Sequence, residues 1–317
     1  MKYMMFLLAL ILSFQKPALA LQLDLKGQVA HQVDRIRSIS GYSEQSFFEL
    51  PGTSLPGDES PVFELIGYGM DAIPLLTPYL SDTSFTQAVR RHGSGMQRPA
   101  RVNEYIIFVI NRIADHKFYL PPDDRDASPG SDAIPPALPR TIEDLQNQIT
   151  VWWEKNRTTS LLDRKIDDVN DPIHDNRFAA YEWLGRTRAK EARLTLEQRI
   201  EALLTGEVNS LKQSEMAACA ESLGQIGEAE SIPAVRKVCD HLSYWLHMSY
   251  RPIEEGRAGT GSEQISTLFK AFRALAALGL KEEALSHLEG FKIKYLEKME
   301  AHTQRDFLRR FESAKDW

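Results

Sequence analysis

The residues of this chain that could bind a metal ion are concentrated in one acidic stretch. It contains one histidine and five aspartates: His174, Asp163, Asp167, Asp168, Asp171 and Asp175. Calcium loops present oxygen ligands at alternate positions and have a glycine at the bend, whereas Val169 and Pro172 interrupt this stretch. We therefore interpret it as a solvated turn between helices and predict no metal site.

The two cysteines, Cys219 and Cys239, leave two alternatives. If a helical hairpin turns near Glu228, the two residues nearly face each other, and a disulfide forms where the Cα atoms lie within about 7 Å. Otherwise both are buried thiols, and burial among apolar side chains disfavours the reactive thiolate. Neither alternative gives a nucleophilic cysteine.

Common catalytic motifs do not occur in the sequence. There is no Gly-x-Ser-x-Gly nucleophile elbow and no His-Glu-x-x-His zinc motif. His241 and His247 are not spaced as an i, i+4 metal pair. We predict a non-enzymatic protein with no catalytic residue, no metal and no cofactor.

The first 20 residues are typical of an export signal. Lys2 precedes an apolar run from Met4 to Phe14, and residues 18–20 form a small-x-small cleavage motif. A membrane-spanning helix needs about 20 apolar residues, and this run is shorter. We expect an exported protein, periplasmic or secreted, with no membrane span once the signal is removed.

The charge of the chain bears on its partners. The formal net charge of −6 becomes more negative when Lys2 and Lys16 leave with the signal. Phosphate binding requires a local excess of basic residues. We therefore expect no nucleic-acid partner.

Helical periodicity occurs in several segments, and none shows sustained alternation of apolar and polar residues. Apolar residues recur at helical spacing over 23–39, and they predominate in 103–120, which we predict to be the most buried helix. Thr141, followed by acidic residues, marks the start of another helix. The expected fold class is all-α.

A proline-rich stretch divides the chain. Proline biases the preceding residue away from helical backbone angles, so residues 121–140 are predicted to be a linker. The predicted domains are a signal peptide (1–20), an irregular N-terminal helical region with a degenerate repeat (21–120), this linker, and a C-terminal repeat region (141–317).

Three phrases of the C-terminal region end in Leu-Gly. "FAAYEWLG", "AACAESLG" and "FRALAALG" align at Leu184-Gly185, Leu223-Gly224 and Leu278-Gly279, with a small residue four positions before the leucine at Ala180, Cys219 and Ala274. This spacing places the small residue and the leucine on one helix face. The glycine could adopt the left-handed conformation that ends a helix. The predicted unit is a helix, a tight turn and a second helix.

The stretch from Asp171 to Ala192 resembles a HEAT repeat, an armadillo-type pair of helices. The matching residues are an Asp-Pro turn, an arginine, two small residues, Leu-Gly and a later alanine: Asp171, Pro172, Arg177, Ala179, Ala180, Leu184, Gly185 and Ala192. The spacing of about 40 residues between the first two phrases fits this family. The resemblance, closest to uncharacterised exported bacterial proteins of this kind, implies a right-handed superhelix of stacked helix pairs, an α solenoid, with a concave binding face.

HEAT-like proteins mostly bind other macromolecules, so the resemblance implies a scaffold that binds a protein or peptide partner. Exposed aromatic and arginine side chains dominate interface energetics. We therefore predict partner contacts from Trp152, Trp153, Tyr250, Arg251 and Arg257. The sequence does not indicate an oligomeric state.

The alternative is an enzyme or carrier that binds a small anionic ligand. Its pocket would lie between the N-terminal region and the repeat array. The basic residues that favour this alternative are Arg90, Arg91, His92 and Arg101.

Overall fold

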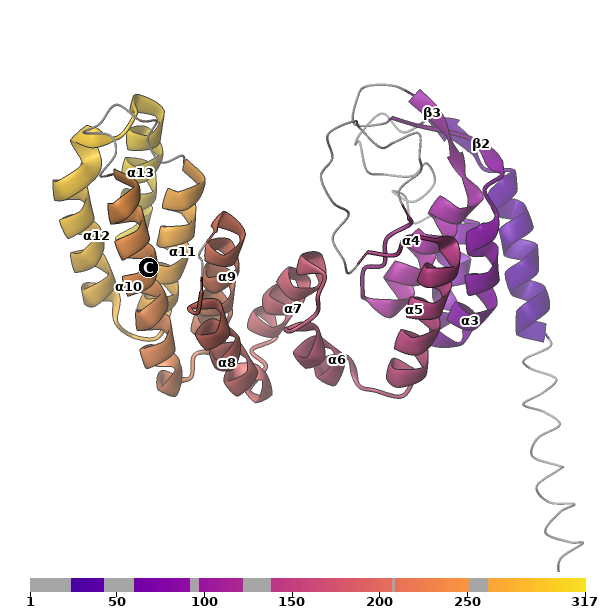
Figure 1. Ribbon diagram of the computed structural model, residues 1–317, viewed down its shortest axis with the longest axis horizontal. Helices are drawn as coiled ribbons and strands as arrows, with labels where there is room; N and C mark the ends of the chain where they lie inside the picture. The colour runs from indigo at the N-terminus through magenta and orange to yellow at the C-terminus, as the bar shows by residue number, and fades with distance from the viewer. Residues whose placement is uncertain (1–23, 43–59, 92–96, 122–137, 207–208, 251–261) are drawn as a thin grey trace, which may run out of the picture. The chain divides into compact units, whose positions relative to one another are not determined.

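A computed structural model describes residues 24–42, 60–91, 97–121, 138–206, 209–250 and 262–317. Within these ranges the protein is mostly helical, as predicted, and the chain divides between Thr159 and Ser160 into two compact units (Figure 1). None of the described helices combines the length and the apolar character needed to cross a membrane. The predicted signal, residues 1–20, lies outside the described ranges, so export stays a prediction.

The N-terminal unit is centred on helix α4 (Val102–Ala114). Tyr105, Ile106, Val109 and Ile110 are completely buried, which agrees with the prediction of a buried helix here. Four short segments contact α4: α2 (Pro61–Gly67), the 3-10 helix η1 (Gly69–Ala72), α3 (Ile73–Leu76) and the 3-10 helix η2 (Thr77–Ser81). A helix over residues 24–37 buries the face that its spacing predicted.

A small sheet in this unit was not predicted. Strand β1 (Ser40–Tyr42) pairs in parallel with β2 (Phe85–Arg91), and β2 pairs antiparallel with β3 (Gln97–Arg101). Residues of β2 do alternate between buried and exposed, but Thr86 and Ala88 are the buried ones, while Phe85 is 55% exposed. Because the inward residues are polar or small and the outward one is aromatic, hydropathy does not reveal this strand.

Helix α5 (Ile142–Asn156) belongs to the N-terminal unit. It begins as predicted, with a capping box in which the Thr141 hydroxyl accepts from the Asp144 amide at 3.0 Å. Leu145 and Ile149 are buried in the N-terminal core, and α5 contacts α3 and η2. The contacts therefore divide the chain after α5, whereas the proline content predicted the boundary at residues 121–140.

The C-terminal unit is a succession of helices. These are α6 (Leu161–Asp168), α7 (His174–Arg186), η3 (Lys190–Ala192), α8 (Arg193–Leu203), α9 (Ser210–Ile226), η4 (Ala229–Ser231), α10 (Ile232–Tyr250), α11 (Ser262–Ala277), α12 (Lys281–Tyr295), η6 (Leu296–Lys298) and α13 (Ala301–Ala314). Helix α9 packs between α7 and α11, and each of α7, α9 and α11 is followed by a second helix (Figure 1). The described helices of this unit share one apolar core.

The three predicted turns share one backbone geometry, with a left-handed residue at Arg188 (φ 53°), Gly227 (φ 81°) and Gly279 (φ 90°). Counting back four residues from each gives three fully buried leucines: Leu184, Leu223 and Leu275. The third unit therefore aligns at Leu275-Ala276, and its small buried residue is Ala271. The predicted alignment at Leu278 and Ala274 is displaced by one helical turn, because the Leu-Gly pair of that phrase lies in the turn itself.

Gly185 and Gly224 do not end their helices, which contradicts the role predicted for them. Both lie inside helices, α7 and α9 respectively. A Cβ atom on Gly224 would lie 2.7 Å from the Cα atom of Ala274 on α11, and one on Gly185 would lie 3.0 Å from the Cα atom of Ser222 on α9. Gly185 and Gly224 therefore allow α7, α9 and α11 to approach one another closely. Of the three Leu-Gly glycines, Gly279 is the one that follows the end of a helix in the left-handed conformation.

A buried ionic cluster joins three helices. Glu215 of α9 is 1% exposed and accepts two hydrogen bonds from Arg177 of α7, at 2.9 and 3.0 Å. It also accepts from Arg199 of α8 at 2.8 Å and from the Tyr181 hydroxyl at 2.7 Å. Arg177 donates in addition to the carbonyl of Asp171 at 2.6 Å, so the arginine of the HEAT-like motif fixes the turn before α7.

Candidate anion-binding groove

Helices α11 and α13 each carry a row of side chains at helical spacing. The row of α11 consists of Ser266, Phe269, Lys270 and Arg273. The row of α13 and the turn after it consists of Arg309, Arg310, Ser313 and Trp317. Residues three, four and seven apart lie on one face of a helix, and the two helices are in contact. The rows line a hollow of ≈ 360 Å³, called the basic groove below.

Acidic neighbours orient the three arginines of the basic groove. Arg273 forms an ion pair with Glu221 of α9. Asp306 of α13 accepts from Arg309 at 2.6 Å and from Arg310 at 2.9 Å. Burial raises the pKa of Asp306, but the hydrogen bonds from these two arginines outweigh it and hold the pKa below its usual value. Asp306 is therefore ionised at neutral pH and pairs with both guanidinium groups.

Lys270 supplies the remaining positive charge. It is exposed on α11, and within the described part of the chain it has neither an ion pair nor a side-chain hydrogen bond. Four cationic side chains thus converge on the groove, and two carboxylates, Glu221 and Asp306, lie against three of them. The net charge of these six side chains is positive, in contrast to the net charge of −6 for the whole chain.

The groove has an aromatic floor. Phe269 is 4% exposed, and its ring meets those of Phe307 and Trp317 edge to face, at centroid distances of 5.2 and 6.3 Å. Such tilted pairs are the favoured geometry for aromatic rings. Packing on both sides of Phe269 gives the floor a fixed shape, with Trp317 left half-buried.

This arrangement can bind an anion. A guanidinium group has five N–H donors, so a single carboxylate partner leaves donors on each arginine for a further acceptor. Lys270 adds a charge whose donors are not used by other described side chains. Carboxylate, phosphate or sulfate oxygens fit this donor set.

No family model, curated protein or solved structure matches this chain. The HEAT resemblance therefore rests on the motif residues and on the turn geometry described above.

The predicted contact residues Trp152 and Trp153 are half-buried on α5, and both pack within the N-terminal unit. Trp153 donates its indole N–H to the carbonyl of Met70 at 2.8 Å, and the Trp152 ring lies beside those of His116 and Phe118. These contacts give both tryptophans a packing role. The other predicted contacts, Arg251 and Arg257 and the side chain of Tyr250, lie outside the described residues.

Cys219 and Cys239 are both buried and both free, so the disulfide alternative is not realised. Cys219 lies in the fully buried small-residue position of α9. Burial raises the pKa of both thiols far above its usual value. The buried-thiol alternative describes them.

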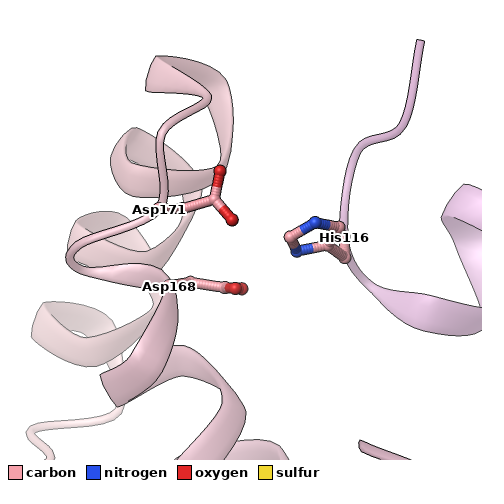
Figure 2. A group of neighbouring side chains, drawn as sticks. All are labelled: His116, Asp168 and Asp171. Carbon is pink, nitrogen blue, oxygen red and sulfur yellow. The ribbon is translucent and has the colours of Figure 1, made fainter. Parts of the chain in front are cut away.

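The acidic stretch is occupied by local contacts. The Asp171 carboxylate accepts from the amide of Ile173 at 2.7 Å. Ser160 caps α6 by accepting from the Asp163 amide at 3.1 Å, and its hydroxyl donates to the Asp163 carboxylate at 2.7 Å. Figure 2 shows Asp168 at the end of α6 and Asp171 in the turn that follows it, drawn with His116 of the N-terminal unit. Because the two units are described separately, no site is inferred from these three residues.

The basic residues of the alternative pocket are described only in part. Arg101 precedes α4 as its N-cap residue and lies over the Phe85 ring, with its Cζ atom 5.4 Å from the centroid. The side chains of Arg90 and Arg91 and all of His92 lie outside the described residues. The alternative pocket therefore stays a prediction.

The residues of the basic groove were not predicted from the sequence. A signal does exist, because Lys270 and Arg273 lie three apart on one helix, and Arg309 and Arg310 share the face of Ser313 on another. What the sequence lacks is any indication that α11 and α13 are neighbours. That adjacency, and hence the groove, comes only from the fold.

Proposed function

We propose that this protein is a non-enzymatic helical scaffold of HEAT-like repeats that binds an acidic segment of a protein partner in the basic groove. The observation that carries the proposal is the convergence of Lys270, Arg273, Arg309 and Arg310 on one groove in an otherwise acidic chain. Complementary charge favours encounter with an acidic partner and disfavours basic ones.

The stacked helix pairs support a scaffold role. The first helices of the three pairs, α7, α9 and α11, pack on one another in succession. The cluster around Glu215 fixes α7, α8 and α9 to one another. A rigid array of this kind presents its side chains in a constant arrangement, as binding requires. The right-handed superhelix implied by the HEAT resemblance is part of this proposal.

A second candidate is a carrier for a small anion. The volume of ≈ 360 Å³ falls in the range of small-molecule sites, about 300 to 1,000 Å³. Such a carrier would bind a free anion as tightly as an anion attached to a peptide.

Isothermal titration calorimetry on the full chain separates the two candidates. The probes are an acetylated, amidated hexamer of glutamate and inorganic sulfate, each measured at low and at high salt. We expect the hexamer to bind more tightly than sulfate, with an affinity that falls as salt rises. The double variant Lys270→Glu, Arg310→Glu should weaken hexamer binding by about tenfold or more.

Two results would count against the scaffold. Sulfate that binds as tightly as the hexamer would replace it with the small-anion carrier. A hexamer that binds the double variant as well as the wild type would remove the basic groove from the account.

A further inference from the structure

We infer that the basic groove recognises an acidic peptide segment that carries one apolar side chain among its carboxylates. The inference rests on the proposed function and adds a specificity to it. Two separate features of the groove support the inference. Its walls are basic side chains from two helices, and its floor between them is apolar.

The walls favour several carboxylates spread along a peptide over one concentrated charge. Arg273 is already paired with Glu221, and Arg309 and Arg310 share Asp306. Each arginine is thus partly neutralised and offers directed N–H groups, whereas Lys270 offers a charge that no described side chain neutralises. A compact dianion can satisfy only the cations next to it, while a short acidic peptide can reach both rows.

The floor favours an apolar side chain. Phe269 and Trp317 both line the groove, and Trp317 is half-buried against the core. Phe269 is only 4% exposed, so the aromatic surface open to a ligand belongs to Trp317. An apolar side chain placed on it removes further apolar area from water, which contributes roughly 25 cal/mol per Å². A peptide made only of acidic residues leaves this aromatic surface exposed to water.

The size of the groove limits the occupant. A hollow of ≈ 360 Å³ accommodates a few side chains and is too small for a folded domain. The occupant that fits charge, floor and size is therefore a short acidic stretch of a partner chain with a single aromatic or aliphatic residue in it.

The test compares two matched peptides by titration calorimetry with the full-length protein. One is an acetylated, amidated pentapeptide with phenylalanine between two pairs of glutamates, and the other has glycine in place of the phenylalanine. We expect the phenylalanine peptide to bind at least about fivefold more tightly than the glycine peptide. A third peptide, with phosphoserine at the central position, serves as the phosphate probe.

Two variants separate the walls from the floor. Lys270→Glu should lower the affinity of the protein for both glutamate peptides. Trp317→Ala should reduce the affinity for the phenylalanine peptide to that for the glycine peptide. The charge control is Lys26→Glu, an exposed lysine of the helix over residues 24–37 in the other unit, which should leave both affinities unchanged. A helical circular dichroism spectrum and a cooperative unfolding transition, measured for each variant, establish that it is folded.

The outcomes distinguish failure of the inferred specificity from failure of the proposed function. Equal binding of the two glutamate peptides, weakened by Lys270→Glu, would overturn the inferred specificity and leave the proposed function standing. Tighter binding of the phosphoserine peptide would overturn the choice of an apolar side chain in favour of phosphate. No binding of any peptide would overturn both the inference and the proposed function, as would equal weakening by Lys26→Glu.

Discussion

Glu215 is the residue on which the packing of α7, α8 and α9 depends most directly. It is almost completely buried, and three side chains, Arg177, Arg199 and Tyr181, donate hydrogen bonds to its carboxylate. A charge in this position is tolerated only because its partners compensate for lost hydration. Removal of the carboxylate would leave Arg177 and Arg199 without the counterion that they share.

We predict that Glu215→Gln lowers the free energy of unfolding by about 3–5 kcal/mol, the usual cost of breaking a buried ion pair. Glu201→Gln provides a matched control, since Glu201 pairs with Lys237 where both side chains are more than half exposed, and its cost should be about 0–1 kcal/mol. Urea unfolding followed by circular dichroism measures both. Similar costs for the two variants would show that the cluster does not brace the helices.

The stability contributed by Glu215 should depend on pH. Burial raises its pKa, but the hydrogen bonds from Arg177, Tyr181 and Arg199 outweigh this and lower the pKa below the ordinary value. The unfolded chain therefore takes up the proton first, and the stabilisation is complete above the ordinary carboxyl pKa of about 4.3 and is lost as the pH falls through the lowered value. The difference in unfolding free energy between wild type and Glu215→Gln, measured from neutral to acidic pH, should shrink in that window, and a constant difference would contradict this assignment.

At the scale of elements, the close approach of first helices is the feature that sequence periodicity alone does not show. Gly224 faces the backbone of Ala274, a group that cannot move aside without shifting α11. Gly185 faces the Cα atom of Ser222 and the end of the flexible Gln225 side chain. The two glycines therefore differ in how much a methyl group would disturb.

We predict that Gly224→Ala destabilises the protein by about 1–3 kcal/mol through overpacking. Gly185→Ala should cost less, because the shortest contact of its new methyl group is with the end of the Gln225 side chain, which can rotate away. The gain in helix propensity of alanine over glycine, up to about 1 kcal/mol, applies to both variants and does not change the order. Urea unfolding midpoints of the two variants test the order. If Gly185→Ala were the more destabilising, the close contact between α9 and α11 would not be as described.

The sequence predicted elements well where the evidence is local. The capping box at Thr141, the apolar face of residues 24–37 and the buried α4 all follow from spacing within one segment. The strand β2 was missed because its inward residues are Thr86 and Ala88. The third repeat was misaligned because Leu278-Gly279 has the sequence of the motif, although the structurally equivalent leucine is Leu275, one helical turn earlier. The basic groove could not be predicted, because it depends on which helices are neighbours in space.

For the whole molecule, the two compact units are the level at which folding can be tested. Each has its own apolar core, and the division falls between Thr159 and Ser160. A unit with its own core should fold alone. We therefore predict that residues 160–317, produced separately, give a helical spectrum and one cooperative unfolding transition, and that a gradual, non-cooperative loss of helix would contradict the division.

A crystal structure of the full chain with the phenylalanine-containing acidic pentapeptide would show whether an acidic partner binds in the basic groove. We expect peptide carboxylates within hydrogen-bonding distance of Lys270 on α11 and of Arg310 on α13, with the phenylalanine ring against Trp317. A peptide bound on any other surface, with the groove unchanged, would contradict this expectation.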